Sequence, residues 1–324
     1  MAAPRLPNAY PVEVAPPDIT PYAAGNTGLP YVQRFEAATP GPSVLIAAIV
    51  HGNEPCGAIA LDWLLQGDFR PRCGSLTLAF MNHRAYAAFD PADPNATRWI
   101  DEDFNRLWGP GRLQEGAATA ERDRAREVAG IVADADLLLD LHSFQHPSAP
   151  LAMAGWTERG VALARATGLP PRIVTDRGHA AGMRMRDHAR FGAEGTVGPA
   201  ALLIECGQHW AASSAALACE TTARFLIQAG LATPDLLERL PSGIPASAPE
   251  AQDVFDVTEA ITIETDAFHF ANPWQGGEIL PQAGTLIGQD GDRPITSPYP
   301  DCLLVMPSMR LWPGQTAVRL ARRR

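Results

Sequence analysis

The sequence contains no lysine, since all 26 of its basic residues are arginines. Enzymes that form a Schiff base, anchor pyridoxal phosphate or bind a nucleotide through a P-loop need a lysine, so these classes are excluded. The arginines are outnumbered by 36 acidic residues, and no stretch of the chain gathers them into a basic surface. We therefore expect no nucleic-acid partner.

Cysteine is scarce, and long apolar runs are missing. The five cysteines are far apart and form no CxxC pair, so nothing signals a disulfide framework or a thiolate zinc site. The longest apolar stretches are only as long as a strand, too short to span a membrane. The proline-broken N-terminus, residues 1–20, lacks the apolar core of a signal peptide. We therefore expect a cytoplasmic protein without a membrane segment.

Short apolar runs alternate with helical patterns over residues 1–240. Hydrophobic residues make up 46% of the chain of 324 residues, enough to fill a sizeable core. Strands are expected at 43–50, 75–81, 135–141, 150–155, 171–175 and 200–206, and helices at 54–66, 119–135, 158–168 and 210–230. Nearly continuous apolar strands between helices are typical of an α/β fold. The sheet should be mainly parallel or mixed, with helices on both faces.

Two irregular segments interrupt this pattern. Residues 241–253 are rich in Pro, Ser and Ala without periodicity, which is typical of a linker. After it, residues 254–324 show short strand patterns between Gly, Pro and Asp turns, so a small all-β domain should follow. Inside the α/β domain, residues 82–117 are also irregular, and a loop of this length in a compact domain is usually functional.

Polar side chains stand where three of the expected strands end. His51 and Glu54 follow the first strand, His142 follows the third, and Glu205 lies near the end of the last. Ligands of open α/β sheets bind at the carboxyl ends of the strands, so these side chains should meet at one edge. Two histidines and a glutamate are a recurring ligand set of hydrolytic zinc sites, which keep one position open for water. His51, Glu54 and His142 are therefore candidate ligands for one zinc ion per chain.

Each of these residues also has a simpler explanation that the sequence leaves open. Glu54 would suit the first turn of a helix because of the helix dipole, and His142 would suit the rim of a core. Asp140 lies two residues before His142 on the same side of the strand, where it would either orient the imidazole or pair with an arginine. Glu205, embedded in an apolar strand, is either a general base with a raised pKa or half of a structural ion pair.

The irregular loop contains the segment TRWIDEDFNR, residues 97–106. By itself, such alternation of charge indicates a solvated surface. Beside a metal site the same residues would have roles in catalysis. Arg98 would stabilise an oxyanion, Asn105 and Arg106 would hold a substrate carboxylate, and Asp103 would orient these donors.

The motifs HGNE, RWIDEDFNR, DLHS and IECG occur in this order and at separations that resemble the succinylglutamate desuccinylase/aspartoacylase family, a branch of the zinc carboxypeptidase-like hydrolases. The resemblance covers about residues 43–210, and the β-rich tail is similar to the smaller C-terminal domain of that family. It implies that His51, Glu54 and His142 bind zinc. It also implies that Glu205 activates the bound water.

For the substrate, the resemblance implies that Arg98 polarises the scissile carbonyl and that Asn105 with Arg106 binds the α-carboxylate of an N-acyl amino acid. The segments SFQHPSAP and CGQHW depart from the family members with known acyl groups, so the acyl group is not implied. An arginine upstream of the catalytic glutamate helps to read an acidic acyl group in those members. The candidates here, among which the sequence does not choose, are Arg184, Arg186 and Arg190.

The sequence therefore predicts a zinc-dependent amidohydrolase that deacylates a small-molecule N-acyl amino acid. One alternative is a carboxypeptidase- or esterase-like hydrolase of another small carboxylate, and another is a non-catalytic zinc-binding sensor on the same scaffold. Assembly into a homo-oligomer is left open. So are the roles, in the pocket or merely in packing, of Tyr299, His146, His209, Cys56 and Cys206.

Overall fold

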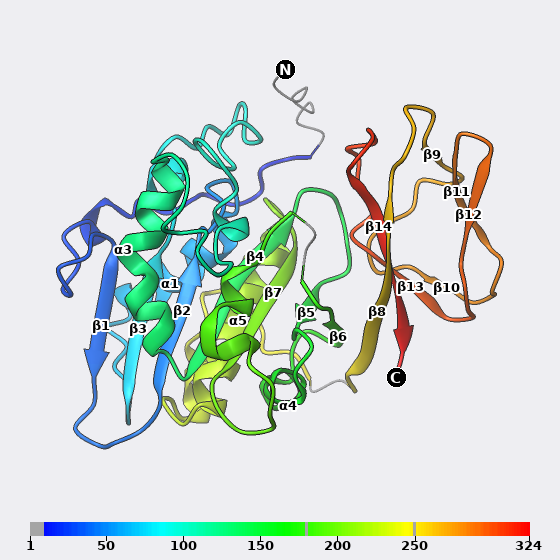
Figure 1. The fold of residues 1–324 in the computed structure, drawn as a ribbon. Helices are drawn as coiled ribbons and strands as arrows, with labels where there is room; N and C mark the ends of the chain where they lie inside the picture. The colour runs from blue at the N-terminus through cyan, green and yellow to red at the C-terminus, as the bar shows by residue number, and fades with distance from the viewer. Residues whose placement is uncertain (1–9, 179–180, 249–250) are drawn as a thin grey trace.

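The computed structural model describes residues 10–178, 181–248 and 251–324. The first nine residues, part of the segment expected to carry no targeting signal, and two residues of the expected linker lie outside the described chain. The described residues form a sheet of eleven strands with helices packed on it and a separate sheet of three strands (Figure 1). None of the described helices combines the length and apolarity that a membrane span requires.

The strands of the α/β part lie where the sequence predicts them. They are β2 (Ser43–Ala48), β3 (Ser75–Phe80), β4 (Leu137–Phe144), β5 (Leu151–Met153), β6 (Arg172–Thr175) and β7 (Ala200–Gln208). Strands β3, β2, β4 and β7 pair in parallel in this order, β5 runs antiparallel to β7, and β6 is parallel to β5. The edge strand β1 (Val32–Glu36), antiparallel to β3, was not predicted. Only Val32 of this strand is fully buried, so its apolar signal is weak.

Helices cover both faces of this sheet, as expected. The longer ones are α1 (Pro55–Gln66), α3 (Ala120–Asp134), α4 (Glu158–Thr167) and α5 (Ala212–Gln228), and the short ones are α2 (His83–Ala87), η1 (Thr20–Tyr22), η2 (Phe104–Arg106), η3 (Met185–Asp187), η4 (Ala189–Gly192) and η5 (Pro234–Arg239). Val44 and Ile46 of β2 pack in one core with α1, α4 and α5, whereas Leu45 and Ala47 pack with α3 on the other face. Burial on both faces explains why the strand is apolar at nearly every position.

The C-terminal segment is all-β and continues the large sheet. Its strands are β8 (Asp253–Thr262), β9 (His269–Phe270), β10 (Ile279–Leu280), β11 (Leu286–Asp290), β12 (Arg293–Thr296), β13 (Cys302–Val305) and β14 (Thr316–Arg323). Strand β8 pairs in parallel with β6, and β14, β13 and β10 follow outward, while β12, β11 and β9 form the separate sheet. The predicted fold is thus confirmed. Hydrogen bonding nevertheless runs unbroken from the α/β part into this β-rich segment (Figure 1).

The sheet face that α3 covers extends from the central strands to the strands of the β-rich segment. Successive side chains of a strand point to opposite faces, so residues two apart share a face. Leu138 and Ala201 pack on the side covered by α3, which places Asp140, His142 and Glu205 on this side as well. A further apolar cluster on this face includes Leu203 of β7, Phe255 of β8 and Ala321 of β14. The side chains of Asp140, His142 and Glu205 therefore lie on the same face of the sheet as this apolar cluster of the C-terminal strands.

Candidate active site

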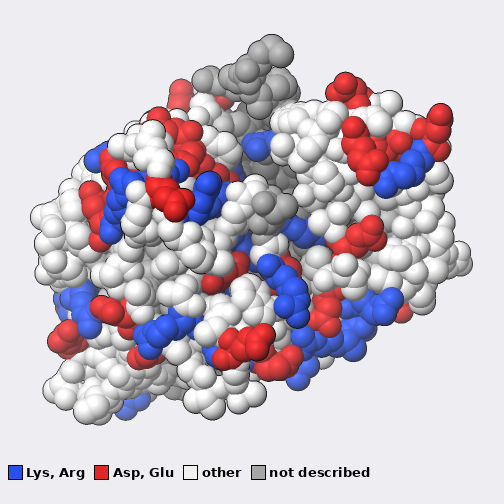
Figure 2. Space-filling model, viewed as in Figure 1, with Lys and Arg blue, Asp and Glu red and all other residues white. Residues whose placement is uncertain are grey.

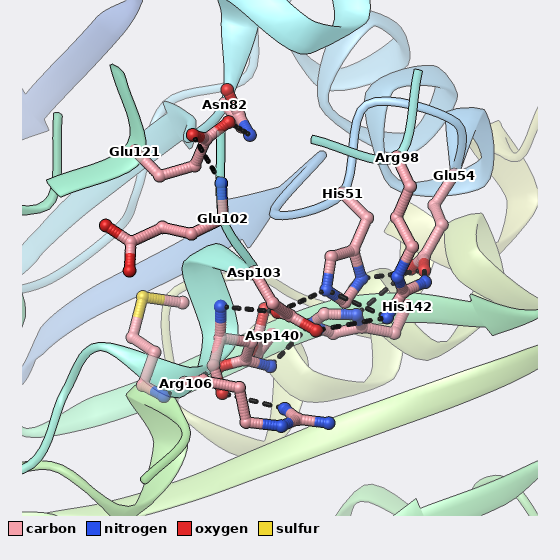
Figure 3. A network of polar contacts seen from close by, with 12 residues as sticks. His51, Glu54, Asn82, Arg98, Glu102, Asp103, Arg106, Glu121, Asp140 and His142 are labelled. Carbon is pink, nitrogen blue, oxygen red and sulfur yellow. Dashed lines mark hydrogen bonds and ion pairs between the residues drawn. The ribbon is translucent and has the colours of Figure 1, made fainter. Parts of the chain in front are cut away.

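The three predicted metal ligands meet at the carboxyl ends of β2 and β4 (Figure 3). Glu54 Oε1 lies 2.8 Å from His51 Nδ1, and Glu54 Oε2 lies 3.0 Å from His142 Nδ1. One ligand atom from each residue lies within 4.8 Å of the others, and all three side chains are buried. Two imidazoles and one carboxylate converging in this way fit the donor set of a zinc ion.

The turn after β2 brings the loop of residues 97–106 against these ligands. Gly52 has no room for a side chain, because a Cβ atom there would lie 2.4 Å from the carbonyl carbon of Ala85 and 2.5 Å from Thr97 O. Its amide donates to Arg98 O at 3.0 Å. Arg98 Nη1 in turn lies 3.1 Å from Glu54 Oε1. A glycine at this position therefore lets Arg98 reach the ligand cluster.

The charges of the cluster are mutually stabilising. Burial by itself would raise the pKa of Glu54, but the neighbouring His51 and His142 outweigh it and hold this pKa well below its usual range. Burial would likewise lower the pKa of His142, but Asp140 and Glu54 raise it well above its usual range. The cluster thus favours positive charge between its carboxylates. A metal ion would supply that charge in place of the imidazole protons, because metal ligation requires neutral histidine.

Asp140 and Asn105 both contact the second nitrogen of His142. Asp140 Oδ1 lies 3.0 Å and Asn105 Nδ2 lies 3.4 Å from His142 Nε2. The Asn105 side chain is also held from the other end, since its Oδ1 accepts a hydrogen bond from Met185 N at 2.7 Å. Both residues therefore restrain the imidazole so that its Nδ1 faces Glu54, which is the arrangement expected of groups that support a metal ligand.

Arg98 and Asp103 contact the other histidine, His51, and Arg106 lies within electrostatic reach of both. Asp103 Oδ1 and Arg98 Nη2 each lie 3.0 Å from His51 Nε2 (Figure 3). Burial would raise the pKa of Asp103, but His51 and the two arginines hold it well below its usual range. Arg106 Nη1 donates to Asn105 O at 2.8 Å, and burial lowers the pKa of Arg106 to about 10. The loop thus contributes two guanidinium groups to the site.

A buried glutamate that the sequence analysis missed holds this loop in place. Glu121, in the first turn of α3, accepts hydrogen bonds from the amides of Ile100, Asp101 and Glu102 at 2.7, 3.0 and 3.3 Å. Its Oε1 also accepts from Asn82 Nδ2 at 3.0 Å (Figure 3). In the sequence, the only signal is that Glu121 comes two positions after Thr119, which caps the helix. This spacing does not indicate that the hydrogen-bond partners of Glu121 are loop amides.

We expect Glu121→Ala to lower the free energy of unfolding by about 3 kcal/mol, because three loop amides and Asn82 would lose a charged acceptor. The loop carrying Arg98 and Arg106 would loosen, so kcat/KM should fall with it. Chemical denaturation and steady-state kinetics measure the two effects. Asp123→Ala, which removes an exposed ion pair with Arg126 on the same helix, is the matched control and should change the free energy of unfolding by less than about 1 kcal/mol. Equal effects of the two substitutions would contradict this role of Glu121.

Glu205 lies beside the ligand cluster with an unpaired oxygen. It is the partner of His142 in the register of β7 with β4, and its side chain is buried. Within the described part of the chain, Glu205 Oε2 has no hydrogen-bond partner. Burial raises the pKa of Glu205 to about 8, although the charges of His142 and Arg98 oppose the shift. Such a carboxyl group can accept and return a proton near neutral pH.

The three arginines among which the sequence did not choose are all engaged elsewhere. Arg184 donates to Asp176 Oδ2 at 3.0 Å and to Asp187 Oδ2 at 2.8 Å. Arg186 is buried and donates to Asp187 Oδ1 at 2.9 Å and to a backbone carbonyl of β7. Arg190 is half exposed and contacts carbonyls at the end of α3. Each of these guanidinium groups thus already contacts a carboxylate or carbonyls of the protein, although the buried Nε of Arg186 has no hydrogen-bond partner among the described residues.

The structure also places the remaining residues whose roles the sequence left open. Tyr299 packs in the core of the β-rich segment, with its hydroxyl 2.7 Å from Thr258 Oγ1. His146 Nδ1 lies 3.2 Å from the hydroxyl of Tyr10. His209 Nδ1 lies 2.8 Å from Ser143 Oγ, and burial lowers the pKa of His209 to about 3, so its ring is neutral. The two cysteines beside the site are buried and free, namely Cys56 and Cys206.

The family model of the succinylglutamate desuccinylase/aspartoacylase catalytic domain matches residues 40–217, more than half of the chain. No curated protein sequence matches.

Similar solved structures include a succinylglutamate desuccinylase from Vibrio parahaemolyticus, which is 18% identical with a TM-score of 0.67 over 91% of this chain and 86% of that one. The succinylglutamate desuccinylase from Chromobacterium violaceum is 18% identical, with a TM-score of 0.63 over 91% and 89% of the two chains. The product-bound ectoine utilization protein EutE (DoeB) from Ruegeria pomeroyi is 19% identical, with a TM-score of 0.59 over 90% and 87%. At these identities the structures show a shared fold.

Proposed function

Because the chain belongs to the succinylglutamate desuccinylase/aspartoacylase family of hydrolases, we propose that it is a zinc-dependent amidohydrolase that removes the acyl group from a small N-acyl amino acid. The observation that carries the proposal is the position of Glu205, a buried carboxyl group with a free oxygen, beside two histidines and a glutamate that converge as metal ligands. Metal binding alone would not require such a group, whereas hydrolysis requires a base.

His51, Glu54 and His142 would hold one zinc ion per chain. When bound, zinc lowers the pKa of a water molecule and polarises the amide carbonyl of the substrate. Asp140 and Asn105 support this role because both contact the ring of His142 on the side away from Glu54.

Glu205 is the proton carrier of the proposed reaction. In its ionised form it takes a proton from the attacking water and passes it to the nitrogen that leaves the acyl group. Burial raises the pKa of Glu205, which favours holding the proton between these two steps. Arg98 donates hydrogen bonds to the oxyanion that forms on the former carbonyl oxygen. Its guanidinium is already aimed at the cluster by contacts with Glu54 and Asp103.

Asn105 and Arg106 are the proposed anchors of the substrate α-carboxylate. Within the described residues Arg106 forms no ion pair, and its guanidinium donates only to Asn105 O. A substrate carboxylate would therefore complete its hydrogen bonds. Asp103 acts as an orienting group, since its charge reaches both Arg98 and Arg106.

A panel of N-acetyl, N-succinyl and longer N-acyl amino acids, assayed beside dipeptides, tests the proposed activity. We expect at least one N-acyl amino acid to be hydrolysed with a kcat/KM at least about 100-fold above that of any dipeptide. The reason is that the charged amino group of a dipeptide would be placed close to the guanidinium groups of Arg98 and Arg106. Cleavage of dipeptides or esters alone would instead favour a carboxypeptidase- or esterase-like enzyme. Zinc binding without hydrolysis of any compound would favour a sensor.

We also propose that the protein works in a reducing compartment, the cytoplasm, on a diffusible small molecule rather than a macromolecule. All five cysteines are free in the described chain, four of them buried, which supports a reducing environment.

A further inference from the structure

The two segments in which the sequence departs from the family are hydrogen-bonded to each other. They are SFQHPSAP, residues 143–150, and CGQHW, residues 206–210. His209 N donates to Phe144 O at 2.8 Å, and the side chain of Gln208 donates to a carbonyl of the first segment at 3.2 Å. The register of β4 with β7 shifts at the same place. The two departures therefore form one structural unit at the carboxyl ends of β4 and β7.

His209 is connected to the proposed metal ligand Glu54 through Ser143. Ser143 Oγ lies 2.8 Å from His209 Nδ1, and both residues are buried. The backbone amide of Ser143 donates to Glu54 Oε2 at 3.1 Å. The same carboxylate oxygen lies 3.0 Å from His142 Nδ1. Ser143 therefore links His209 to the carboxylate that stands between the two proposed histidine ligands.

Trp210 holds the turn that carries Glu54. Its indole Nε1 donates to Asn53 O at 3.2 Å, and its side chain is completely buried. The rings of His209 and Trp210 pack with their centroids 5.8 Å apart. These two neighbouring side chains thus secure Glu54 at two points, its carboxylate through Ser143 and its backbone through Asn53.

The CGQHW segment is itself held from the side of α5. Ser214 Oγ, in the first turn of this helix, donates to Gln208 O at 2.7 Å, and Trp210 N donates to Gln208 Oε1 at 2.9 Å. Gly207 has a φ of +120°, and a Cβ atom there would lie 2.7 Å from Ser214 Oγ. Glycine is therefore needed for this close approach. Side chains that are locked by their own neighbours can hold a functional group in one geometry.

The contacts between the two segments are made by uncharged groups. Burial lowers the pKa of His209 to about 3, so its ring is neutral. Figure 2 shows Arg, Asp and Glu side chains spread over the visible face of the molecule, whereas backbone atoms and neutral side chains make these contacts. A neutral imidazole can be buried at low cost when its nitrogen is hydrogen-bonded. An apolar side chain would fill the same space, so what the histidine adds is its hydrogen bond to Ser143.

We propose that His209 and Trp210 are positioning residues for the metal site. Through Ser143 and Asn53 they preorganise the carboxylate of Glu54 to bind the ion. Groups that orient a ligating carboxylate matter to the metal, and removing one typically costs about 10- to 100-fold in metal affinity or activity. The inference rests on the proposed function, because it takes Glu54 as a zinc ligand.

Zinc affinity tests the proposal directly. His209→Ala should raise the Kd for zinc, measured by competition with a chromophoric chelator, by about 10- to 100-fold. His209→Asn should recover most of the affinity, because its amide offers a hydrogen-bonding atom near the position of Nδ1. Trp210→Phe keeps an aromatic ring and removes the N–H group. It should therefore raise the Kd by about 2- to 10-fold, the range of one neutral hydrogen bond.

A double-mutant cycle shows whether His209 acts through Ser143. Ser143→Ala should weaken zinc binding about as much as His209→Ala, and the double substitution should add little more. His188→Ala is the matched control, since His188 Nδ1 lies 2.7 Å from Trp108 O and its ring packs against that indole. It should leave the Kd unchanged. Thermal unfolding of the metal-free variants checks that each is folded, and Ser143→Ala and Trp210→Phe decide the question if His209→Ala does not fold.

Cobalt bound in place of zinc gives a readout that a general loss of stability would not move. The visible d–d absorption of bound Co²⁺ depends on the geometry of its ligands. We expect this spectrum to change in His209→Ala, to be largely restored in His209→Asn and to stay the same in His188→Ala. The inference is overturned if folded His209→Ala and Ser143→Ala proteins keep the wild-type Kd and cobalt spectrum.

The same measurements separate this inference from the proposed function. If zinc affinity depends on His209 while no N-acyl amino acid is hydrolysed, the positioning role stands and the proposed function fails. If N-acyl amino acids are hydrolysed but the Kd and the cobalt spectrum ignore His209, Ser143 and Trp210, the function stands and the inference fails. A wild-type protein that binds neither zinc nor cobalt would overturn both.

Discussion

Glu205→Gln should retain zinc and lose turnover by two or more orders of magnitude, the effect of removing a general base. Glutamine keeps the size of the side chain but can neither accept the proton of the attacking water nor return it to the leaving nitrogen. The position next to His142 in the sheet register and the free Oε2 are the reasons to expect so large a loss. The measurement is kcat with the best substrate, together with zinc content per chain.

The same substitution should stabilise the metal-free protein at alkaline pH. The pKa of Glu205 is about 8 in the folded chain, against an ordinary value of 4.5. Below pH 4.5 the carboxyl group is protonated whether the chain is folded or unfolded. Between these two values only the unfolded chain releases the proton, so folding stability falls as pH rises, and above pH 8 the loss is complete. Glutamine avoids this loss, which is of the order of a few kcal/mol at about 1.4 kcal/mol per pKa unit.

Glu220→Gln provides the contrast for both effects. Glu220 is a buried glutamate of α5 that pairs with Arg224 and accepts from Ser247 N at 2.7 Å, far from the ligand cluster. Its replacement should lower stability and leave kcat unchanged. Urea unfolding of both variants and the wild-type protein, in the presence of a chelator at pH 5 and pH 9, gives the comparison. A rate of Glu205→Gln equal to that of the wild type would remove Glu205 from the mechanism.

His142→Ala should reduce the zinc content from about one ion per chain to well under half, with loss of activity of at least about two orders of magnitude. The reason is that a site with three protein ligands would keep only His51 and Glu54. Elemental analysis of the purified protein measures the first effect and steady-state kinetics the second. Dialysis of the wild-type protein against a chelator should produce the same inactivity, and added zinc should restore it.

The loss of His142 should also destabilise the metal-free protein, because Glu54 and Asp140 would be left as buried carboxylates without the imidazole between them. His269→Ala, at an exposed position of β9, is the control and should change neither zinc content nor activity. Activity in metal-free wild-type protein, or full zinc content in His142→Ala, would end the argument for a zinc site at these residues.

The sequence was informative wherever the signal lay within one element. The six apolar runs of the α/β part became strands because strands buried on both faces are apolar at nearly every position. Strand β1 escaped prediction because it lies at the edge with one fully buried residue. The convergence of His51, Glu54 and His142 was also predictable, since parallel strands bring their carboxyl ends to one edge.

Contacts that follow neither from periodicity nor from strand ends were beyond the sequence. Nothing in the chain near Glu121 discloses that its carboxylate holds three amides of a loop some twenty residues earlier, because hydrogen bonds to backbone atoms leave no trace in the identity of the partner residues. The sequence likewise could not show that Arg184 and Arg186 are paired, because this depends on where Asp176 and Asp187 lie in space.

The sequence by itself thus determined the α/β sheet and the all-β tail and indicated the candidate metal ligands and the candidate base, because each follows from periodicity or from residues placed at strand ends. Only the tertiary structure decided which arginines pair with carboxylates of the protein. Strand β8 pairs with β6, and β14 pairs with β8. Arg319 of β14 therefore lies on the same face of the sheet as Glu205, although the two are more than 100 positions apart in the sequence. The pairing of a charged side chain is settled by such long-range packing, and no local pattern records it.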